Sequence, residues 1–103
     1  MIMTENKDVW VFPENISFDK AAEFVEKLNE NKESLNIVFD LSSTINIHSS
    51  FIGFLIHAKH HLNRRGVNLT LILSLTVEKL LILLNIIEYF SPDVKVHINR
   101  KSA

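Results

Sequence analysis

The feature that most constrains this sequence is a regular alternation of short β-type runs with longer segments that have helical spacing. The clearest run, Leu35–Leu41, is apolar on nearly both faces, which is typical of a central strand in a parallel sheet. The run Val67–Leu73 alternates apolar with polar residues and predicts the next strand. We expect a first strand at Asp8–Phe12, with Met1–Thr4 beside it as a weak edge strand, and a last strand at Val94–Ile98.

Segments with helix signals lie between the predicted strands. Ser17 offers an N-cap for the first helix. The apolar residues of that helix recur at helical spacing: Phe18, Ala21, Ala22, Val25 and Leu28. Ser74 caps the third predicted helix, which runs through Leu84 and closes at Asn85, a residue able to take the left-handed conformation.

The second predicted helix has Ser49 or Ser50 as its N-cap and runs to about Arg65, before Gly66, a natural residue to follow a helix end. The strands and helices therefore alternate, which predicts an α/β fold with a mostly parallel central β-sheet, right-handed crossovers and helices packed on the sheet. A chain of 103 residues can bury one core, so we assign residues 1–103 to a single domain.

Charge and composition exclude several classes of function. The chain has 11 Lys and Arg against 12 Asp and Glu, so we expect neither a nucleic-acid-binding surface nor a polybasic membrane tether. The apolar stretch Leu69–Ile87 contains Glu78 and Lys79, which are costly to bury in lipid, so we expect no membrane insertion. Residues 1–8 lack the basic and apolar regions of a signal peptide, and we expect a cytoplasmic protein.

Enzymatic chemistry has little support in the sequence. Because there is no cysteine, disulfides, thiolate catalysis and cysteine metal sites are excluded. Only 2 glycines are present, so phosphate-binding glycine loops are absent and we expect no cofactor. His48 and Ser49 are adjacent, and neighbouring residues rarely present their functional groups to each other. We therefore expect a protein that is not an enzyme.

A histidine-rich segment lies in the second predicted helix. His57 and His61 are four residues apart and could face one metal ion. No Glu stands between them as in zinc-binding HExxH helices, and the helix contains no Asp or Glu at all. Other basic residues follow on the same helix: Lys59, His60, Arg64 and Arg65. We therefore favour a solvated basic face and expect no metal site.

The strongest local feature is the run Ile47–Gly53, where the second helix begins. In open α/β sheets, ligands and partners are met at the carboxyl ends of strands and at the helix starts that follow them. A serine hydroxyl there lies near free backbone N–H groups and the positive end of the helix dipole. A phosphate at Ser49 would fit this position, yet would present a charge of about −1.5 to −2 to a docked partner. The competing interpretation is that Ser49 and Ser50 only cap the helix.

Three large apolar residues follow these serines: Phe51, Ile52 and Phe54. They cover more than one stripe of the helix, so two interpretations stay open. Either all three are buried, or Phe51 is exposed as an anchor for a partner.

The run from Ile37 to Phe90 resembles a STAS domain, the fold of bacterial anti-sigma factor antagonists. That family shows a strand ending in Asp-Leu, a helix start of the type Asp-Ser-Ser/Thr-Gly, a helix that ends at Gly, another strand and a third helix. The matching stretches here are Val38–Leu41, His48–Gly53, Arg65–Gly66, Leu71–Leu81, Asn85–Ile86 and Tyr89–Phe90. Val11–Ile16 also resembles the second strand and turn of the family, so the likeness covers nearly the whole chain.

The resemblance implies a non-catalytic role in transcription regulation. Such antagonists bind an anti-sigma factor that is also a serine kinase, and phosphorylation of the first serine of the motif ends the interaction. That serine corresponds to Ser49, ahead of Ser50 as the phosphorylation site. The implied partner-binding residues are His48, Ser49, Ser50, Phe51, Ile52 and Phe54. Two of them depart from the family pattern, because His48 replaces an Asp and Phe51 replaces a Gly.

The resemblance also leaves an alternative partner open. Some small cytosolic STAS subunits bind the ATPase of an ABC-type lipid-transport complex, and this chain has a similar length. A homodimer is a further arrangement that the sequence does not exclude.

Overall fold

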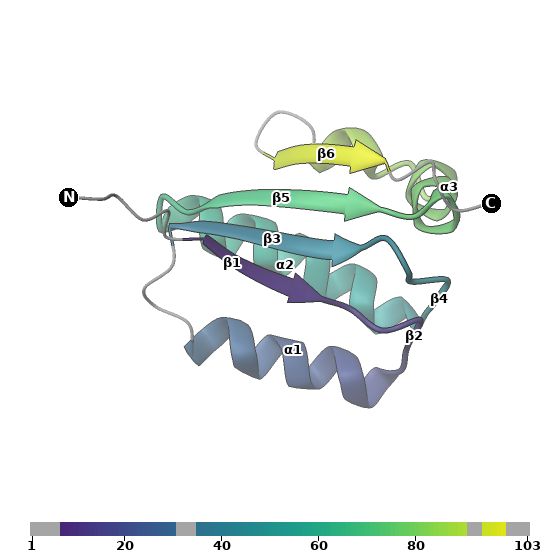
Figure 1. Ribbon diagram of the computed structural model, residues 1–103, viewed down its shortest axis with the longest axis horizontal. Coiled ribbons are helices and arrows are strands. Elements are labelled where there is room, and N and C mark those ends of the chain that lie inside the picture. Colours follow the sequence, from purple (N-terminus) through teal and green to yellow (C-terminus); the bar gives the residue numbers. More distant parts are fainter. Residues whose placement is uncertain (1–6, 31–34, 91–93, 99–103) are drawn as a thin grey trace.

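Figure 1 shows the computed structural model of the protein, which describes residues 7–30, 35–90 and 94–98. Its main sheet has four strands in the order β1-β3-β5-β6, and every neighbouring pair is parallel. The strands are β1 (Lys7–Val11), β3 (Asn36–Leu41), β5 (Asn68–Leu73) and β6 (Val94–Ile98). The predicted α/β class with a mostly parallel sheet is confirmed, and β3 lies inside the sheet as its apolar character predicts. The edge strand predicted at Met1–Thr4 lies outside the described residues.

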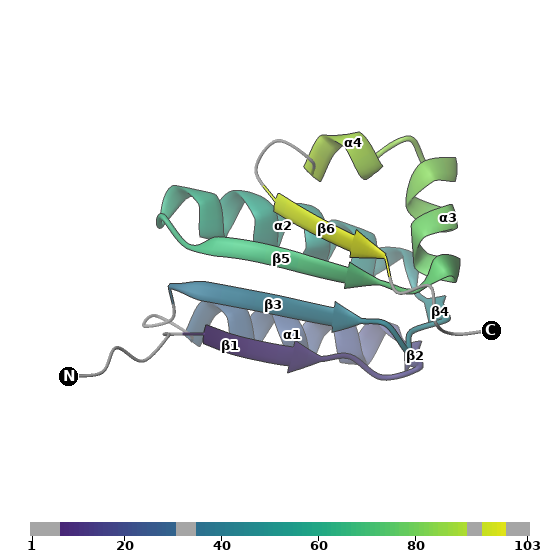
Figure 2. The same ribbon diagram turned by 45° about the horizontal axis from the view of Figure 1, so that its top comes forward.

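Two helices cover one face of the main sheet. α1 (Phe18–Glu30) follows the first strand and α2 (Ser49–Arg64) follows the second, and they pack side by side (Figures 1 and 2). The strand residues that face them align across the sheet, since Trp10 pairs with Phe39 and Phe39 with Leu71. All three of these side chains are buried. The alternation of a strand's side chains thus places one row against the helices.

The core between sheet and helices is built around aromatic rings. The ring centroid of Phe39 lies 5.1 Å from that of Trp10, 5.2 Å from that of Phe12 and 5.6 Å from that of Phe54. Phe51 joins the cluster, with its centroid 5.3 Å from that of Phe12. These separations are within the range in which aromatic pairs attract each other beyond the effect of burial.

A small second sheet was not predicted. β2 (Asn15–Ile16) pairs in parallel with β4 (Asn46–Ile47), and neither segment was predicted to form a strand of its own. Backbone bonds tie it together, because the Ile45 N–H donates to the Glu14 carbonyl at 2.9 Å and the His48 N–H donates to the Ile16 carbonyl at 2.8 Å. Two-residue strands are too short to produce a periodic pattern, so their pairing becomes visible only when both segments are brought together.

The remaining helices are α3 (Leu75–Leu83) and the short α4 (Ile87–Phe90), the second of which was not predicted. Ser74 caps α3 as expected, since its hydroxyl oxygen accepts the Val77 N–H at 3.1 Å. The left-handed conformation expected at Asn85 is also confirmed, with φ 63°. Among the helices of the described residues, none combines the length and the apolar character needed to cross a membrane.

Candidate functional site

The site begins at the edge of the sheet where the strands end, and both α1 and α2 start there (Figure 1). His48 is the N-cap of α2, in an extended conformation with φ −72° and ψ 149°. Its Nδ1 accepts the Ser50 backbone N–H at 3.0 Å. The prediction that Ser49 or Ser50 caps this helix is therefore wrong. An imidazole nitrogen can satisfy an N–H two residues later much as an Asp or Asn oxygen does.

The two serines after this cap have different surroundings. Ser49 is the first residue of α2 and is exposed to solvent. Ser50 is half-buried, and its Oγ lies 2.9 Å from Nδ1 of His48. No contact was expected between His48 and the adjacent Ser49. The contact is made instead to Ser50, two residues after His48. Of the two hydroxyls, that of Ser49 is the more accessible to a modifying enzyme.

Two hollows lie beside the start of α2. One has a volume of about 270 Å³ and separates the first turns of α1 and α2; it is lined by Phe18, Ala21, Ala22, Val25 and Ser50. The other has a volume of about 370 Å³ and is more polar; it is lined by Asn15, Ile16, Ser17, Asn46, Ile47 and His48. Ser50 therefore borders the first hollow and His48 borders the second.

The rim of the apolar hollow includes an exposed aromatic ring. Phe18 is 60 % exposed, and its ring makes an edge-on contact with that of His48 at a centroid distance of 5.7 Å. The periodicity of α1 had indicated Phe18 as a core residue. It lies on the surface instead, at the first position of α1, where it borders the apolar hollow.

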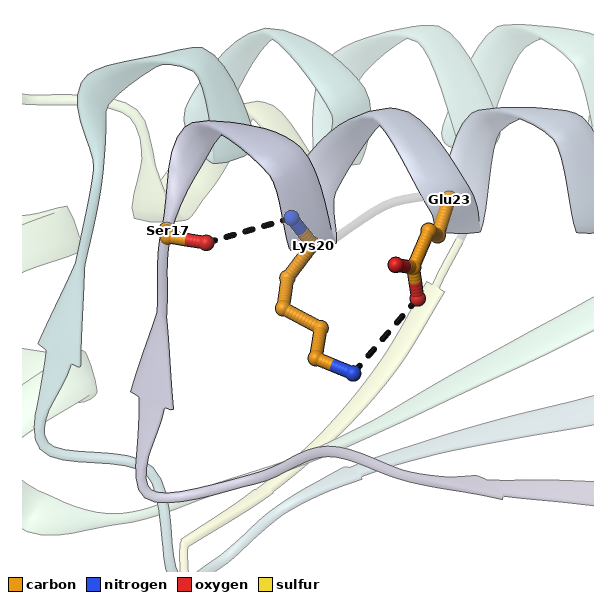
Figure 3. A network of polar contacts seen from close by, with 3 residues as sticks. All are labelled: Ser17, Lys20 and Glu23. Atoms are coloured by element: carbon orange, nitrogen blue, oxygen red, sulfur yellow. Dashed lines mark hydrogen bonds and ion pairs between the residues drawn. The ribbon is translucent and has the colours of Figure 1, made fainter.

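The start of α1 is fixed locally, as Figure 3 shows. The Ser17 hydroxyl accepts the Lys20 backbone N–H at 3.2 Å, which confirms Ser17 as the cap. The Lys20 ammonium lies 3.5 Å from a carboxylate oxygen of Glu23, and these side chains are 50 % and 65 % exposed. An ion pair so exposed contributes little to stability. The cap is therefore the more important of these two contacts for the start of α1.

The three apolar residues after the serines do not all reach the surface. Phe51 is 0 % exposed and Phe54 is 3 % exposed, and both belong to the aromatic core. Ile52 is half-buried and packs against that core. The structure therefore excludes Phe51 as an exposed anchor, and it buries two of the three residues completely. Phe51 and Phe54, expected among the partner-binding residues, therefore do not present their rings to a partner, because both rings pack in the aromatic core against Phe12 and Phe39.

The basic residues of α2 are not all solvated, which corrects part of the expectation. Lys59 is only 7 % exposed, and its ammonium lies 4.4 Å from the centre of the Tyr89 ring. This cation–π contact, together with the burial of the aliphatic stem, accounts for its position. Nε2 of His60 hydrogen-bonds the Tyr89 hydroxyl, so α2 and α4 are joined by a polar contact as well. Within the described segments, no group of three or more His, Cys, Asp or Glu residues could hold a metal ion.

Neither a scan against protein-family models nor a search of the curated proteins finds a match to this chain. The resemblance to a STAS domain therefore stays a prediction.

Proposed function

We propose that this protein is a non-catalytic regulatory binding module of the anti-sigma factor antagonist kind, acting in the cytoplasm. Its docking surface consists of Phe18, Ala22, Val25, His48, Ser49 and Ser50. The observation that carries the proposal is the exposure of Ser49 at the first turn of α2, next to the apolar hollow between α1 and α2. A partner segment with an apolar side chain can enter that hollow while its polar groups contact the serines.

The burial of Phe51 supports this proposal. A Phe where the family has a Gly would block the close approach of a partner if its ring were exposed. Because the ring is 0 % exposed and packs on Phe12 and Phe54, it leaves the outer side of the helix start clear. The second departure from the family pattern is equally compatible with docking, since His48 caps the helix in place of an Asp.

A phosphate on Ser49 would act as a switch at this surface. The first turn of α2 contains no acidic residue that would repel it. The helix dipole favours a negative charge there, typically by about 0.3–1 kcal/mol at an exposed position. The fold would therefore tolerate the phosphate, whereas a partner docked over Ser49 would have to bury its charge or leave.

The proposal is tested with a purified serine kinase of the anti-sigma factor type, ATP and Mg²⁺. We expect one phosphate per chain, located on Ser49 by peptide mass spectrometry, and none on Ser49→Ala. Ser43→Ala is the matched control, because Ser43 is an exposed serine in the turn after β3, outside the docking surface. It should be phosphorylated like the natural chain.

Binding to the same kinase is measured by calorimetry. Ser49→Asp should weaken binding at least tenfold, whereas Ser43→Asp should leave it unchanged. Phosphate on another residue, or equal binding by both Asp variants, would contradict the proposed switch. Tight binding to the ATPase of an ABC-type transporter, with none to the kinase, would refute the antagonist role and favour the transport subunit.

A further inference from the structure

The carboxyl half of α2 contains a pair of histidines that the proposed function does not use. The rings of His57 and His61 lie side by side, with their centroids 5.6 Å apart and their planes inclined by 23°. His57 is exposed and His61 is half-buried. We propose that these two side chains form a binding site for one divalent transition-metal ion of the kind that prefers nitrogen ligands.

The geometry of the helix favours chelation by this pair. Residues four apart on an α-helix lie on the same face, with their Cβ atoms about 5–6 Å apart. A metal ion bound by two imidazoles needs a nitrogen of each ring at about 2.0–2.1 Å. The two rings already share one side of α2. The last side-chain bond of each histidine is a soft torsion, so we expect the rings to turn a nitrogen each toward a common point while α2 stays in place.

The identity of the ligands sets the class of ion. Neutral imidazole suits Cu²⁺, Ni²⁺ and Zn²⁺, whereas Mg²⁺ and Ca²⁺ prefer oxygen ligands. For such a site the affinity order places Cu²⁺ first, with Ni²⁺ and Zn²⁺ behind it. With two protein ligands, water occupies the remaining coordination positions, and the ion exchanges with solvent. Arg64, also exposed on α2, repels the ion, but charges separated by water are strongly screened in comparison with direct coordination.

His60 lies between the two but does not belong to the pair. Its Nε2 is engaged by the Tyr89 hydroxyl on the side of α2 that faces α4. His60 is therefore a matched control, because it is a histidine of the same helix whose side chain contacts α4 and not the pair. The pair lies in the carboxyl half of α2, whereas the docking surface includes the start of this helix. The metal site can therefore be tested independently of the proposed function.

The experiment uses the full chain without a polyhistidine tag. Cu²⁺, Ni²⁺, Zn²⁺ and Mg²⁺ are titrated separately and followed by calorimetry. We expect one Cu²⁺ per chain, weaker binding of Ni²⁺ and Zn²⁺, and no binding of Mg²⁺. His57→Ala or His61→Gln should each weaken Cu²⁺ binding on the order of 100-fold, the gain that linking two ligands provides. His60→Ala should leave the affinity unchanged.

A spectroscopic readout makes the result independent of small folding effects. Electron paramagnetic resonance of the Cu²⁺ complex should show two coordinating nitrogens in the natural chain and one in each variant of the pair. Circular dichroism of every variant checks that α2 is intact. Undiminished binding by His57→Ala and His61→Gln, or absence of Cu²⁺ binding by the natural chain, would overturn the proposal.

Discussion

The cap of α2 depends on one nitrogen atom, and this is a property of the residue His48 alone. Its Nδ1 accepts the Ser50 N–H at 3.0 Å, and no carboxylate stands in the first turn to replace it. We expect His48→Ala to lower the free energy of unfolding by about 1 kcal/mol, the usual cost of a lost N-cap. His48→Asp should restore it, because a carboxylate oxygen makes the same bond and interacts well with the helix dipole. Urea denaturation of the three proteins measures both values, and equal stability of the Ala variant would show that the cap contributes nothing.

At the scale of the element, the two glycines of the chain have opposite roles, since Gly53 lies inside α2 and Gly66 lies just after its C-cap Arg65. Gly66 has φ 76°, and the Val67 N–H donates back to the Leu62 carbonyl at 2.9 Å, as in a Schellman closure. A Cβ at Gly66 or at Gly53 would meet no atom within 4 Å, so any effect of adding one comes from the backbone. Gly66→Ala should destabilise the protein by about 1–2 kcal/mol, the cost of a left-handed L-residue. Gly53→Ala should stabilise it by about 0.5–1 kcal/mol, because Gly53 lies inside a helix. Thermal unfolding distinguishes the two, and a shift of the same sign for both would refute the assignment.

For the whole molecule, the sheet has two unequal faces, since α1 and α2 lie on the same side of it (Figure 2). Phe39 faces these helices and is 0 % exposed, whereas Val11, on the opposite face of the edge strand β1, is 70 % exposed. Phe39→Ala should cost about 3–5 kcal/mol, the range for emptying an aromatic core position. Val11→Thr should change stability by no more than about 0.5 kcal/mol, as surface substitutions usually do. Guanidinium denaturation measures both, and a large loss for Val11→Thr would mean that this face is covered.

Much of the candidate site could be located from sequence, and its details could not. The run at Ile47–Gly53 was correctly placed at the start of a helix after the second main strand. The cap, however, is His48 rather than a serine. A histidine caps a helix only when a ring nitrogen accepts a backbone N–H of the first turn, as Nδ1 of His48 does from Ser50. Phe18 borders the site from the first position of α1, although its spacing indicated the core.

Local signals decided where the elements begin and end. Ser17, Ser74, Gly66 and Asn85 act on backbone groups within a few residues of themselves, so their roles could be read directly from the sequence. The alternation of strands and helices likewise predicted a parallel sheet, because a parallel connection needs a crossover. Those features are determined by the sequence alone.

Tertiary structure decided the features that depend on contacts between distant segments. The pairing of β2 with β4 joins residues about thirty positions apart and has no periodic signal of its own. Phe51 is buried because Phe12 and Phe54 surround it, and Lys59 is buried because the Tyr89 ring lies over its charge. The type of a residue limits the contacts that its side chain can make. Packing against residues from distant parts of the chain then determines whether that side chain is buried or exposed. The sequence therefore determined the strands of the main sheet, the three longer helices and their order. Only the assembled fold added β2, β4 and α4 and decided which side chains remain exposed at the start of α2.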